Sequence, residues 1–446
     1  MPKGRNELPI FPLGLAQIAA GLGRHSVAIY DLQLFSHPLA IIGKIMRQER
    51  PDLVGVSLIA VDSSASYDKF YYFDLFVSCI REIKKAQKGA ATVTGGPGFT
   101  LFAEEIMKKV PEIDFGIPFE GEETMAELIE NLDRPQAVTG LYYRKGGNLF
   151  FTGKRDPLDI DRLPPPRIEH FNLDDYRGRA EQIGVQTKRG CIFRCLYCTY
   201  PYLGGRKIRM RSVGKVVDEI EELSKNGIDK IFICDSIFNY PPEHAAGICR
   251  EILRRKIKIK WKAFFNEHFL NRELVDLATK AGCELFIFGP DGSHSRTLKK
   301  INKNFSIADM KRAYALVKKA SGARFKCAFM FNGPGETVTT FFATLKWVLN
   351  LIRSGRFEFS ISNIRIYPHT GLYRLAINRG LIREGTSLII PRYYNPYPLR
   401  LISYFLNITG TLLYRLIRLI RRDNPPIHSP AIGKRCIYLH SANKPR

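Results

Sequence analysis

With 446 residues, 45% hydrophobic and 25% charged, the chain is long enough for two or three domains and has the composition of a soluble globular protein. Its polar opening residues argue against a secretory signal peptide, and its nine irregularly spaced cysteines argue against a secreted disulfide framework, so we expect a cytoplasmic protein. The formal net charge of +25 would attract nucleic acid, an anionic membrane surface or an anionic cofactor.

The first 150 residues alternate between strand-like and helical segments. Strands are expected at Val27–Asp31, Asp52–Ile59, Ala91–Thr94 and Phe115–Ile117, and helices at Tyr67–Lys85 and Phe102–Lys109. This alternation predicts a doubly wound, Rossmann-like α/β domain over residues 1–150, in which ligands bind beyond the carboxyl ends of the strands. The candidate contacts there are Asp62, Ser63 and Ser64 after the second strand and Gly95 and Gly96 after the third.

A second α/β series follows a linker over residues 151–183, where three consecutive prolines, 164–166, exclude a helix or a central strand. A strand begins the series at 184–187. Further strands are expected at Lys230–Cys234, Lys260–Phe265, Glu284–Phe288, Phe325–Phe331 and Phe359–Ile366, with helices at Val213–Asn226, Pro242–Arg255, Arg272–Ala281 and Ile307–Ala320. These six βα-like repeats predict a parallel barrel, partial or complete, over residues 184–385.

Three cysteines with C-x₃-C-x₂-C spacing, Cys191, Cys195 and Cys198, follow the first strand of this series. Three thiolates at this spacing can hold three irons of a [4Fe–4S] cluster and leave the fourth iron open. A zinc site would need a fourth ligand, and no Cys or His follows until Cys234, which lies within an apolar strand. The spacing therefore favours an iron–sulfur cluster.

The residues around this cysteine loop suit that role. Gly190 allows the chain to bend before the first ligand, and the cations Lys188, Arg189 and Arg194 are expected to help keep the thiolates deprotonated. The six other cysteines lie in apolar contexts and are expected to be buried small hydrophobes: Cys79, Cys234, Cys249, Cys283, Cys327 and Cys436.

The cysteine loop, with the aromatic Tyr197 before its last cysteine, resembles the signature of radical S-adenosylmethionine (SAM) enzymes. The resemblance implies a (β/α)₆ partial TIM barrel and a [4Fe–4S] cluster whose open iron chelates SAM. It also implies one-electron cleavage of SAM to methionine and a 5′-deoxyadenosyl radical, with a reductase, flavodoxin or ferredoxin as electron donor.

Further segments are similar to the SAM-contacting parts of that family. Gly204 and Gly205 follow the cysteine loop where the family has a turn that touches the methionine amine. Asp235 and Asn239 follow a strand that ends at the barrel mouth, where side chains bind or catalyse, although Asp235 could instead cap the following turn.

Two later strand ends also match. Asp291 and Ser293 resemble the segment near the SAM ribose, and His294 after them could face the substrate or the solvent. Residues 332–337 match the family's Gly-x-Pro-Gly-Glu-Thr turn, in which Glu336 could simply occupy the first turn of the following helix.

The N-terminal domain resembles that of the cobalamin-dependent subclass of radical SAM enzymes. The matching segments are Phe11–Gly21, Pro51–Ser57, Thr94–Pro97 and Phe119–Glu123, in that order. The resemblance implies cobalamin as a further cofactor, bound by the candidate contacts after the second and third strands. An Asp-x-His-x-x-Gly motif is absent, which implies that no histidine from it reaches cobalt, and we expect the domain to lack its first strand.

Residues 386–446 form a basic tail. From Leu399 to Arg422, polar residues recur every three or four positions, which predicts an amphipathic helix with cations on its polar face. Its uncharged centre is shorter than the roughly 20 apolar residues that span a bilayer. The helix could lie on the inner membrane surface, which would make the protein peripheral, or it could dock on the barrel.

We therefore expect a cobalamin-dependent radical SAM methyltransferase that acts on an unactivated carbon of a small-molecule or lipid-like substrate. One alternative is a radical rearrangement or cyclisation without methyl transfer. A protein that modifies or binds RNA is the other alternative, suggested by the charge, but the sequence lacks a stacking module of basic and aromatic residues.

Overall fold

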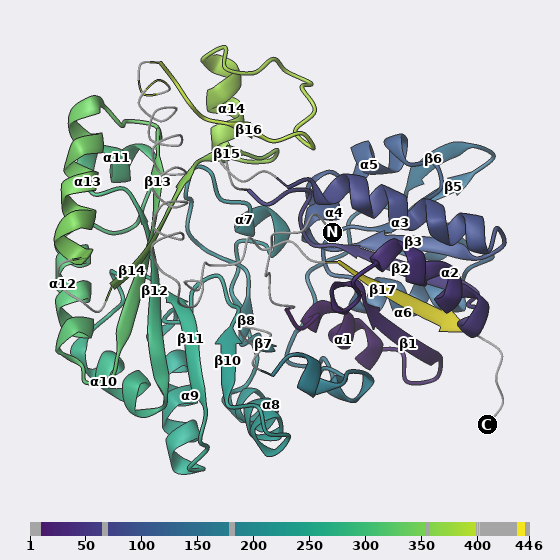
Figure 1. Cartoon of the computed structure of the whole chain (residues 1–446), viewed down its shortest axis with the longest axis horizontal. Helices are drawn as coiled ribbons and strands as arrows, with labels where there is room; N and C mark the ends of the chain where they lie inside the picture. Colours follow the sequence, from purple (N-terminus) through teal and green to yellow (C-terminus); the bar gives the residue numbers. More distant parts are fainter. Residues whose placement is uncertain are drawn as a thin grey trace.

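The computed structural model describes residues 10–64, 70–177, 183–352, 357–397, 399, 401 and 435–441. Two α/β units lie next to each other, an N-terminal sheet with helices on both faces and a second, curved sheet (Figure 1). Within the described residues, no helix has the length and apolar character needed to cross a membrane. The predicted amphipathic helix over Leu399–Arg422 lies almost wholly outside them.

The N-terminal sheet has the strand order β1-β17-β2-β3-β4-β5-β6. Its strands are β1 (Ser26–Asp31), β2 (Leu53–Leu58), β3 (Ala91–Gly95), β4 (Phe115–Ile117), β5 (Tyr142–Lys145), β6 (Asn148–Phe151) and β17 (Arg435–Ser441). Strands β2, β3 and β4 are parallel, which confirms the predicted doubly wound core. The antiparallel hairpin of β5 and β6 was not predicted.

Helices cover both faces of this sheet. One face carries α1 (Leu13–Ala20) and α6 (Glu122–Glu130), and the other carries α2 (Pro38–Glu49), α3 (Tyr72–Ala86), α4 (Pro97–Leu101) and α5 (Ala103–Lys109). Each face has its own core, because the strands bury apolar side chains in both directions. Leu53 and Val93 pack toward α1 and α6, whereas Val54 and Val56 pack toward α2 and α3.

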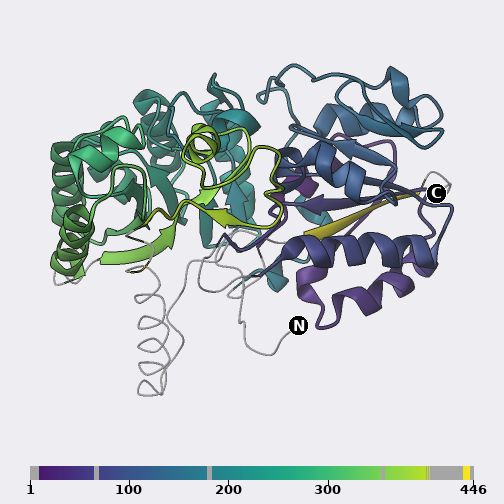
Figure 2. The ribbon, with the colours of Figure 1, turned by 90° about the horizontal axis from the view of Figure 1, so that it is seen from above.

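Strand β17 comes from the far end of the chain and lies between β1 and β2 (Figure 2). It pairs antiparallel with both neighbours over six residue pairs each. We expected the domain to lack its first strand; in the structure, a strand from the predicted tail lies between β1 and β2.

The second sheet has the order β14-β13-β12-β11-β10-β7, and every neighbouring pair is parallel. Its strands are β7 (Ile183–Val185), β10 (Lys230–Ile233), β11 (Lys260–Phe265), β12 (Cys283–Asp291), β13 (Arg324–Phe331) and β14 (Phe357–Asn363). Its helices are α8 (Val213–Lys225), α9 (Pro242–Arg254), α10 (Arg272–Lys280), α12 (Ile307–Lys319) and α13 (Val338–Ile352). This arrangement confirms the (β/α)₆ partial barrel.

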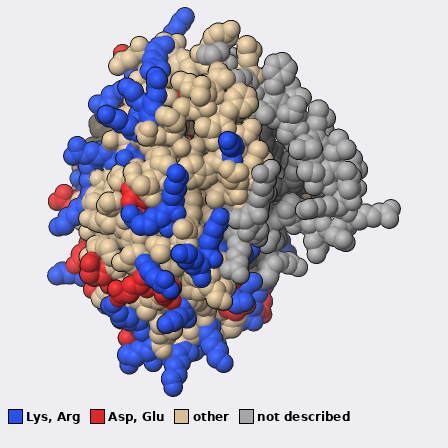
Figure 3. Space-filling view, turned by 90° about the vertical axis from the view of Figure 1, so that its left-hand side faces the viewer, with Lys and Arg blue, Asp and Glu red and all other residues tan. Residues whose placement is uncertain are grey.

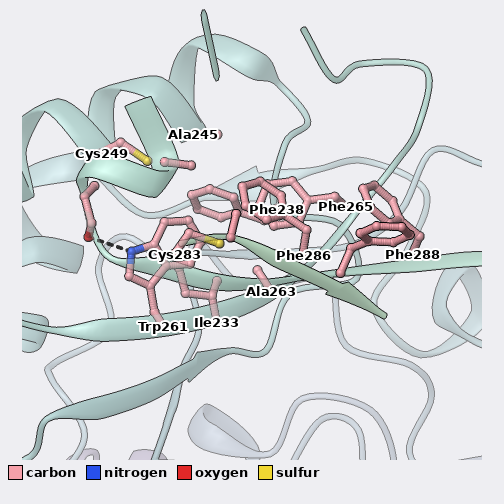
Figure 4. Close-up of a cluster of buried hydrophobic side chains, with 14 of the residues drawn as sticks. Ile233, Phe238, Ala245, Cys249, Trp261, Ala263, Phe265, Cys283, Phe286 and Phe288 are labelled. Atoms are coloured by element: carbon pink, nitrogen blue, oxygen red, sulfur yellow. Dashed lines mark hydrogen bonds between the residues drawn. The ribbon is translucent and has the colours of Figure 1, made fainter. Parts of the chain in front are cut away.

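Aromatic side chains fill the layer between the barrel strands and their outer helices. Trp261 and Phe265 of β11 pack with Phe286 of β12, and Trp261 Nε1 donates a hydrogen bond of 2.8 Å to Ala281 O (Figure 4). The alternate β11 residues, Lys262 and Phe264, are only half-buried. Because successive side chains of a strand point to opposite faces, the inner face of the barrel is the less densely covered one.

The other cysteines mostly behave as predicted. Cys79, Cys249, Cys283 and Cys327 are buried, which confirms the expectation for them. Cys234 is half-buried, because it alternates with the outward-packed Ile231 and Ile233 and therefore faces the barrel interior. The side chain of Cys436 lies outside the described structure.

After β14 the chain returns to the N-terminal unit. The segment contains β15 (Arg365–Ile366), α14 (Gly371–Asn378) and β16 (Arg392–Tyr393). Its residues Ile366, Leu372 and Tyr394 are fully buried and belong to the same apolar core as Val54 and Phe76 of the N-terminal domain. The two units are therefore joined by a continuous core as well as by the linker.

Candidate functional site

The cysteine loop lies at the mouth of the barrel. It connects β8 (Lys188–Arg189) to α7 (Tyr200–Leu203), and β8 pairs antiparallel with β9 (Arg209–Met210). Cys191 N donates a hydrogen bond of 3.0 Å to Gly205 O, which closes the base of the loop. Gly190 has a φ of +90°, and a Cβ there would lie 2.2 Å from Lys207 O, so only glycine fits.

The three predicted ligands share this loop, with Cys191 buried, Cys195 and Cys198 half-buried, and all three thiols free. Burial raises the pKa of each, and raises that of Cys198 to about 12. Bound iron would reverse this effect, since a coordinating thiol is deprotonated outright. In the part of the chain that the structure describes, no three His, Cys, Asp or Glu side chains converge on one ion. Each cysteine of a [4Fe–4S] cluster binds a different iron, so the loop fits that cluster better than a zinc ion.

The cations next to the loop do not act as predicted. The Lys188 ammonium is buried and donates to Phe238 O at 2.7 Å, and Arg189 is paired with two glutamates of the N-terminal domain. The cations that lower the pKa of Cys191, against the larger effect of burial, are Lys303 and Arg206. The expectation for Lys188 and Arg189 is therefore not supported, because both side chains are engaged by partners of their own.

Two predicted residues, Tyr197 and Asp291, both contact Lys303, which the sequence analysis did not single out. Lys303 forms a buried ion pair with Asp291, donates to Tyr197 Oη at 3.0 Å and donates to Gly289 O at 2.6 Å. Tyr197 Oη also donates to Asp291. The three side chains form a buried polar cluster beside Cys195, whose charge interacts with both Lys303 and Asp291.

Other predicted strand-end residues bond within the protein. The Asp235 carboxylate accepts hydrogen bonds from Thr187 N at 2.8 Å and from Thr187 Oγ1 at 2.5 Å, and therefore holds the strand that leads into the cysteine loop. Asn239 Nδ2 donates to Asn266 O at 2.9 Å, and Ser293 Oγ donates to Thr344 Oγ1 at 2.9 Å. These contacts support positioning roles.

His294 and Glu336 both close local turns. His294 is exposed and caps α11 (Ser295–Lys300) through Nδ1, which accepts from Arg296 N at 3.2 Å. Glu336 precedes α13 and accepts from Asn332 N, so it closes the turn after β13 rather than occupying the helix's first turn.

The edge of the N-terminal sheet holds the polar loop expected to contact cobalamin. Asp62 Oδ1 accepts from Ser64 N at 2.6 Å, Ser63 Oγ accepts from Phe70 N at 3.1 Å, and Ser64 Oγ lies 2.8 Å from Tyr367 Oη. Asp62 is also paired at 2.5 Å with Arg365 of β15.

The side chain of Arg365 has buried hydrogen-bond donors that suit a further ligand at this edge. Its side chain is 2% exposed, yet Nε and Nη1 have no hydrogen-bond partner within the described residues. Buried donors of this kind are normally satisfied, and the amide and phosphate oxygens of cobalamin are suitable acceptors. The loop and Arg365 therefore fit that group.

Gly95 and Gly96 serve the packing of strands. Gly96 has a φ of +99°, and a Cβ there would lie 2.8 Å from Leu58 O. A Cβ on Gly95 would lie 3.1 Å from Ile117 O. The backbone conformation and close packing at Gly96 require glycine, whereas Gly95 is only tightly packed, whatever ligand binds beyond them.

A salt-bridge network joins the cysteine loop to the N-terminal domain. Arg189 Nη1 lies 3.0 Å from Glu120 Oε1 and Nη2 lies 2.5 Å from Glu122, while Arg209 lies 2.8 Å from Glu120. Burial raises the pKa of Glu120, but hydrogen bonds from Arg209 and the charge of Arg189 outweigh it, so the net pKa is lowered. A shallow cleft beside this network is lined by Phe119, Lys154, Gly204 and Gly205, among others.

Sequence reasoning missed Lys303 and Arg365. Neither lies in a motif, and each is brought to its site by a long-range contact. The charges of Glu120 and Glu122 were visible as an acidic segment, but their partners were not.

Comparisons with known proteins match both halves of the chain. The model of the B12 binding domain matches residues 6–129, and that of the radical SAM superfamily matches residues 185–348. An uncharacterised methyltransferase of Pyrococcus horikoshii is 28% identical over 379 residues, which is 83% of this chain and 79% of that protein.

Solved structures agree in fold. TsrM from Kitasatospora setae, a radical SAM methyltransferase with tryptophan and a SAM analogue bound, gives a TM-score of 0.75 at 22% identity and covers 84% of this chain and 74% of its own. The cobalamin-dependent radical enzyme OxsB, with aqua-cobalamin and SAM bound, gives 0.72 at 17% identity, with 94% of this chain and 67% of its own covered.

Proposed function

Because the chain belongs to the radical SAM enzymes that carry a B12-binding domain, we propose that it transfers a methyl group to an unactivated carbon of a small polar molecule. The observation that carries this proposal is the Arg189–Glu120 contact, which ties the cysteine loop to the domain matching the B12 model. Because this ion pair connects the two cofactor-binding regions, it supports a reaction in which both cofactors act on one substrate.

The cofactors of the enzyme are a [4Fe–4S] cluster, SAM and cobalamin. When bound, the cluster supplies the electron that cleaves SAM and cobalamin carries the methyl group. Cys191, Cys195 and Cys198 would hold the cluster, and Arg365 with the polar loop after β2 would contact cobalamin. Asp235 would position the cysteine loop through Thr187.

The chemistry of the barrel interior supports a polar substrate. Lys262 of β11 and Lys326 of β13 alternate with outward-packed residues, so they belong to the inner face. Such groups suit a substrate with charged or hydrogen-bonding substituents, and we therefore favour a polar molecule over a lipid-like one.

The test is anaerobic reconstitution of the full chain with iron, sulfide and cobalamin, followed by incubation with SAM deuterated at its methyl group and a polar metabolite extract. We expect 5′-deoxyadenosine together with a product that carries the label. A Cys191→Ala/Cys195→Ala/Cys198→Ala variant should lose both the cluster and the products.

The same experiment separates the alternatives. Deoxyadenosine without label transfer would replace methylation by a rearrangement or cyclisation. A triple variant that kept its iron and its activity would overturn the proposal altogether.

A further inference from the structure

Five exposed cations surround the cysteine loop, and we call them the loop collar. They are Arg194, Arg206, Lys207, Lys299 and Lys300. On the basis of the radical SAM chemistry above, we propose that the loop collar is the docking surface for a small acidic electron-transfer protein that reduces the cluster.

Backbone hydrogen bonds hold the collar on both sides of the loop. On one side, Cys191 N donates a hydrogen bond of 3.0 Å to Gly205 O. This contact places the next two residues, Arg206 and Lys207, beside the first cluster ligand. On the other side, Leu196 N donates to Ile301 O at 3.0 Å, directly after Lys299 and Lys300 of α11.

The second side is held by a side chain as well. Asn302 Nδ2 donates a hydrogen bond of 2.8 Å to Arg194 O. The end of α11 is therefore fixed against the middle of the cysteine loop, and its lysines stay close to Arg194.

The loop between these cations reaches the surface. Ile192 is 39% exposed and Arg194 is exposed, although both lie between cluster ligands in the sequence. A protein that covers this loop would therefore bring its own redox centre close to the thiols. Electron transfer weakens steeply with distance, so the shortest approach matters.

The charge of the collar is not neutralised within the described chain. None of its five side chains forms an ion pair with a described Asp or Glu. Asp309 is the sole acidic residue from Gly292 to Lys319, and it is occupied by the N-terminal cap of α12 and by Arg312.

Free cations around a redox centre suit an anionic partner. Opposite charges steer such proteins together and raise the association rate, and encounters between electron-transfer proteins bury little surface. In each encounter the donor centre loses one electron and the cluster gains it, and no bond or proton is exchanged. A reduced flavodoxin or ferredoxin has the required chemistry.

The whole protein is basic, so a local role must be distinguished from a general attraction. Lys and Arg side chains are spread over the outer face of the barrel, with Asp and Glu gathered in its lower part (Figure 3). A matched control therefore needs the same change of charge at a distance from the loop.

The test compares two charge-reversed variants of the reconstituted enzyme. One is Lys207→Glu/Lys299→Glu/Lys300→Glu in the collar. The control is Lys280→Glu/Lys318→Glu/Lys319→Glu, whose exposed lysines lie at the ends of α10 and α12 next to the opposite, amino ends of the barrel strands. Iron content and cluster reduction by dithionite are measured first, because a small reductant needs no docking surface.

The reduction rate with reduced flavodoxin is then followed by stopped-flow absorbance at low and high salt. We expect the collar variant to be roughly tenfold slower at low salt, with the difference shrinking at high salt, and the control to be nearly unchanged. Equal slowing of both variants, or no slowing of the collar variant, would overturn the docking surface. A collar variant that lost only its binding to anionic vesicles or RNA would overturn it too. Deoxyadenosine formation with dithionite tests the proposed function separately.

Discussion

Arg189 Nη1 lies 3.0 Å from Glu120 Oε1, and this contact joins the strand before the cysteine loop to the N-terminal domain. Glu120 also accepts from Arg209 at 2.8 Å, and all three side chains are at most 16% exposed. Two arginines therefore share one buried carboxylate across the domain interface.

The first prediction removes that carboxylate. Glu120→Ala leaves two buried guanidinium groups short of a partner, and we expect the free energy of unfolding to fall by about 3 kcal/mol. The nearby Glu123→Ala removes only a pair whose carboxylate is 55% exposed, and should cost less than about 1 kcal/mol. Urea unfolding of both variants measures the difference, and equal losses would contradict the importance of the interface.

The second prediction concerns pH. Burial raises the pKa of Glu336 to about 7, against hydrogen bonds from Asn332 and Gly333 that lower it. The folded state thus keeps a proton that the unfolded chain releases above a pKa of about 4.5. As the pH rises from the unfolded pKa of about 4.5 to the folded pKa of about 7, the free energy of unfolding should fall by up to about 3 kcal/mol, at roughly 1.4 kcal/mol per pKa unit.

Glu336→Gln has the same shape and does not titrate. We expect its stability to change less than that of the original chain between about pH 5 and about pH 7.5. Urea titrations at both values test this, and parallel profiles for the two proteins would show that Glu336 does not carry the dependence.

The third prediction tests β17. Leu439 pairs with Ala28 of β1 and with Val54 of β2, and a proline there removes a donor from the middle of the sheet. In Leu439→Pro we expect faster amide hydrogen exchange in β1 and β2, while the barrel strands keep their protection. Asn443→Pro, beyond the strand, is the control. Unchanged exchange in β2 would exclude β17 from the sheet in solution.

The barrel was predictable because each strand is a short apolar run followed by a helix of regular period, as in β11 and α10. The hairpin of β5 and β6 was missed, although its turn has a recognisable signal. Gly146 and Gly147 both have positive φ, as a two-residue hairpin turn requires.

Strand β17 could not be found in this way. Its two partners lie hundreds of residues earlier in the chain, and no local pattern encodes an antiparallel strand inserted in a parallel sheet. Lys303 was missed for the same reason. A lysine between two asparagines carries no motif, and only the fold brings it to Asp291 and Tyr197.

The last prediction examines that buried pair. Lys303→Met would leave the Asp291 carboxylate buried without its cation and should cost about 3–5 kcal/mol in the free energy of unfolding. Asp291→Asn alone should also be costly, because it leaves the Lys303 ammonium without its counter-charge. The double variant Asp291→Asn/Lys303→Met removes both charges together and should recover much of the loss, with a coupling energy of about 1–3 kcal/mol. Iron content after reconstitution shows whether the cysteine loop beside the pair survives each change. Additive effects of the two substitutions would mean that Asp291 and Lys303 do not interact in solution.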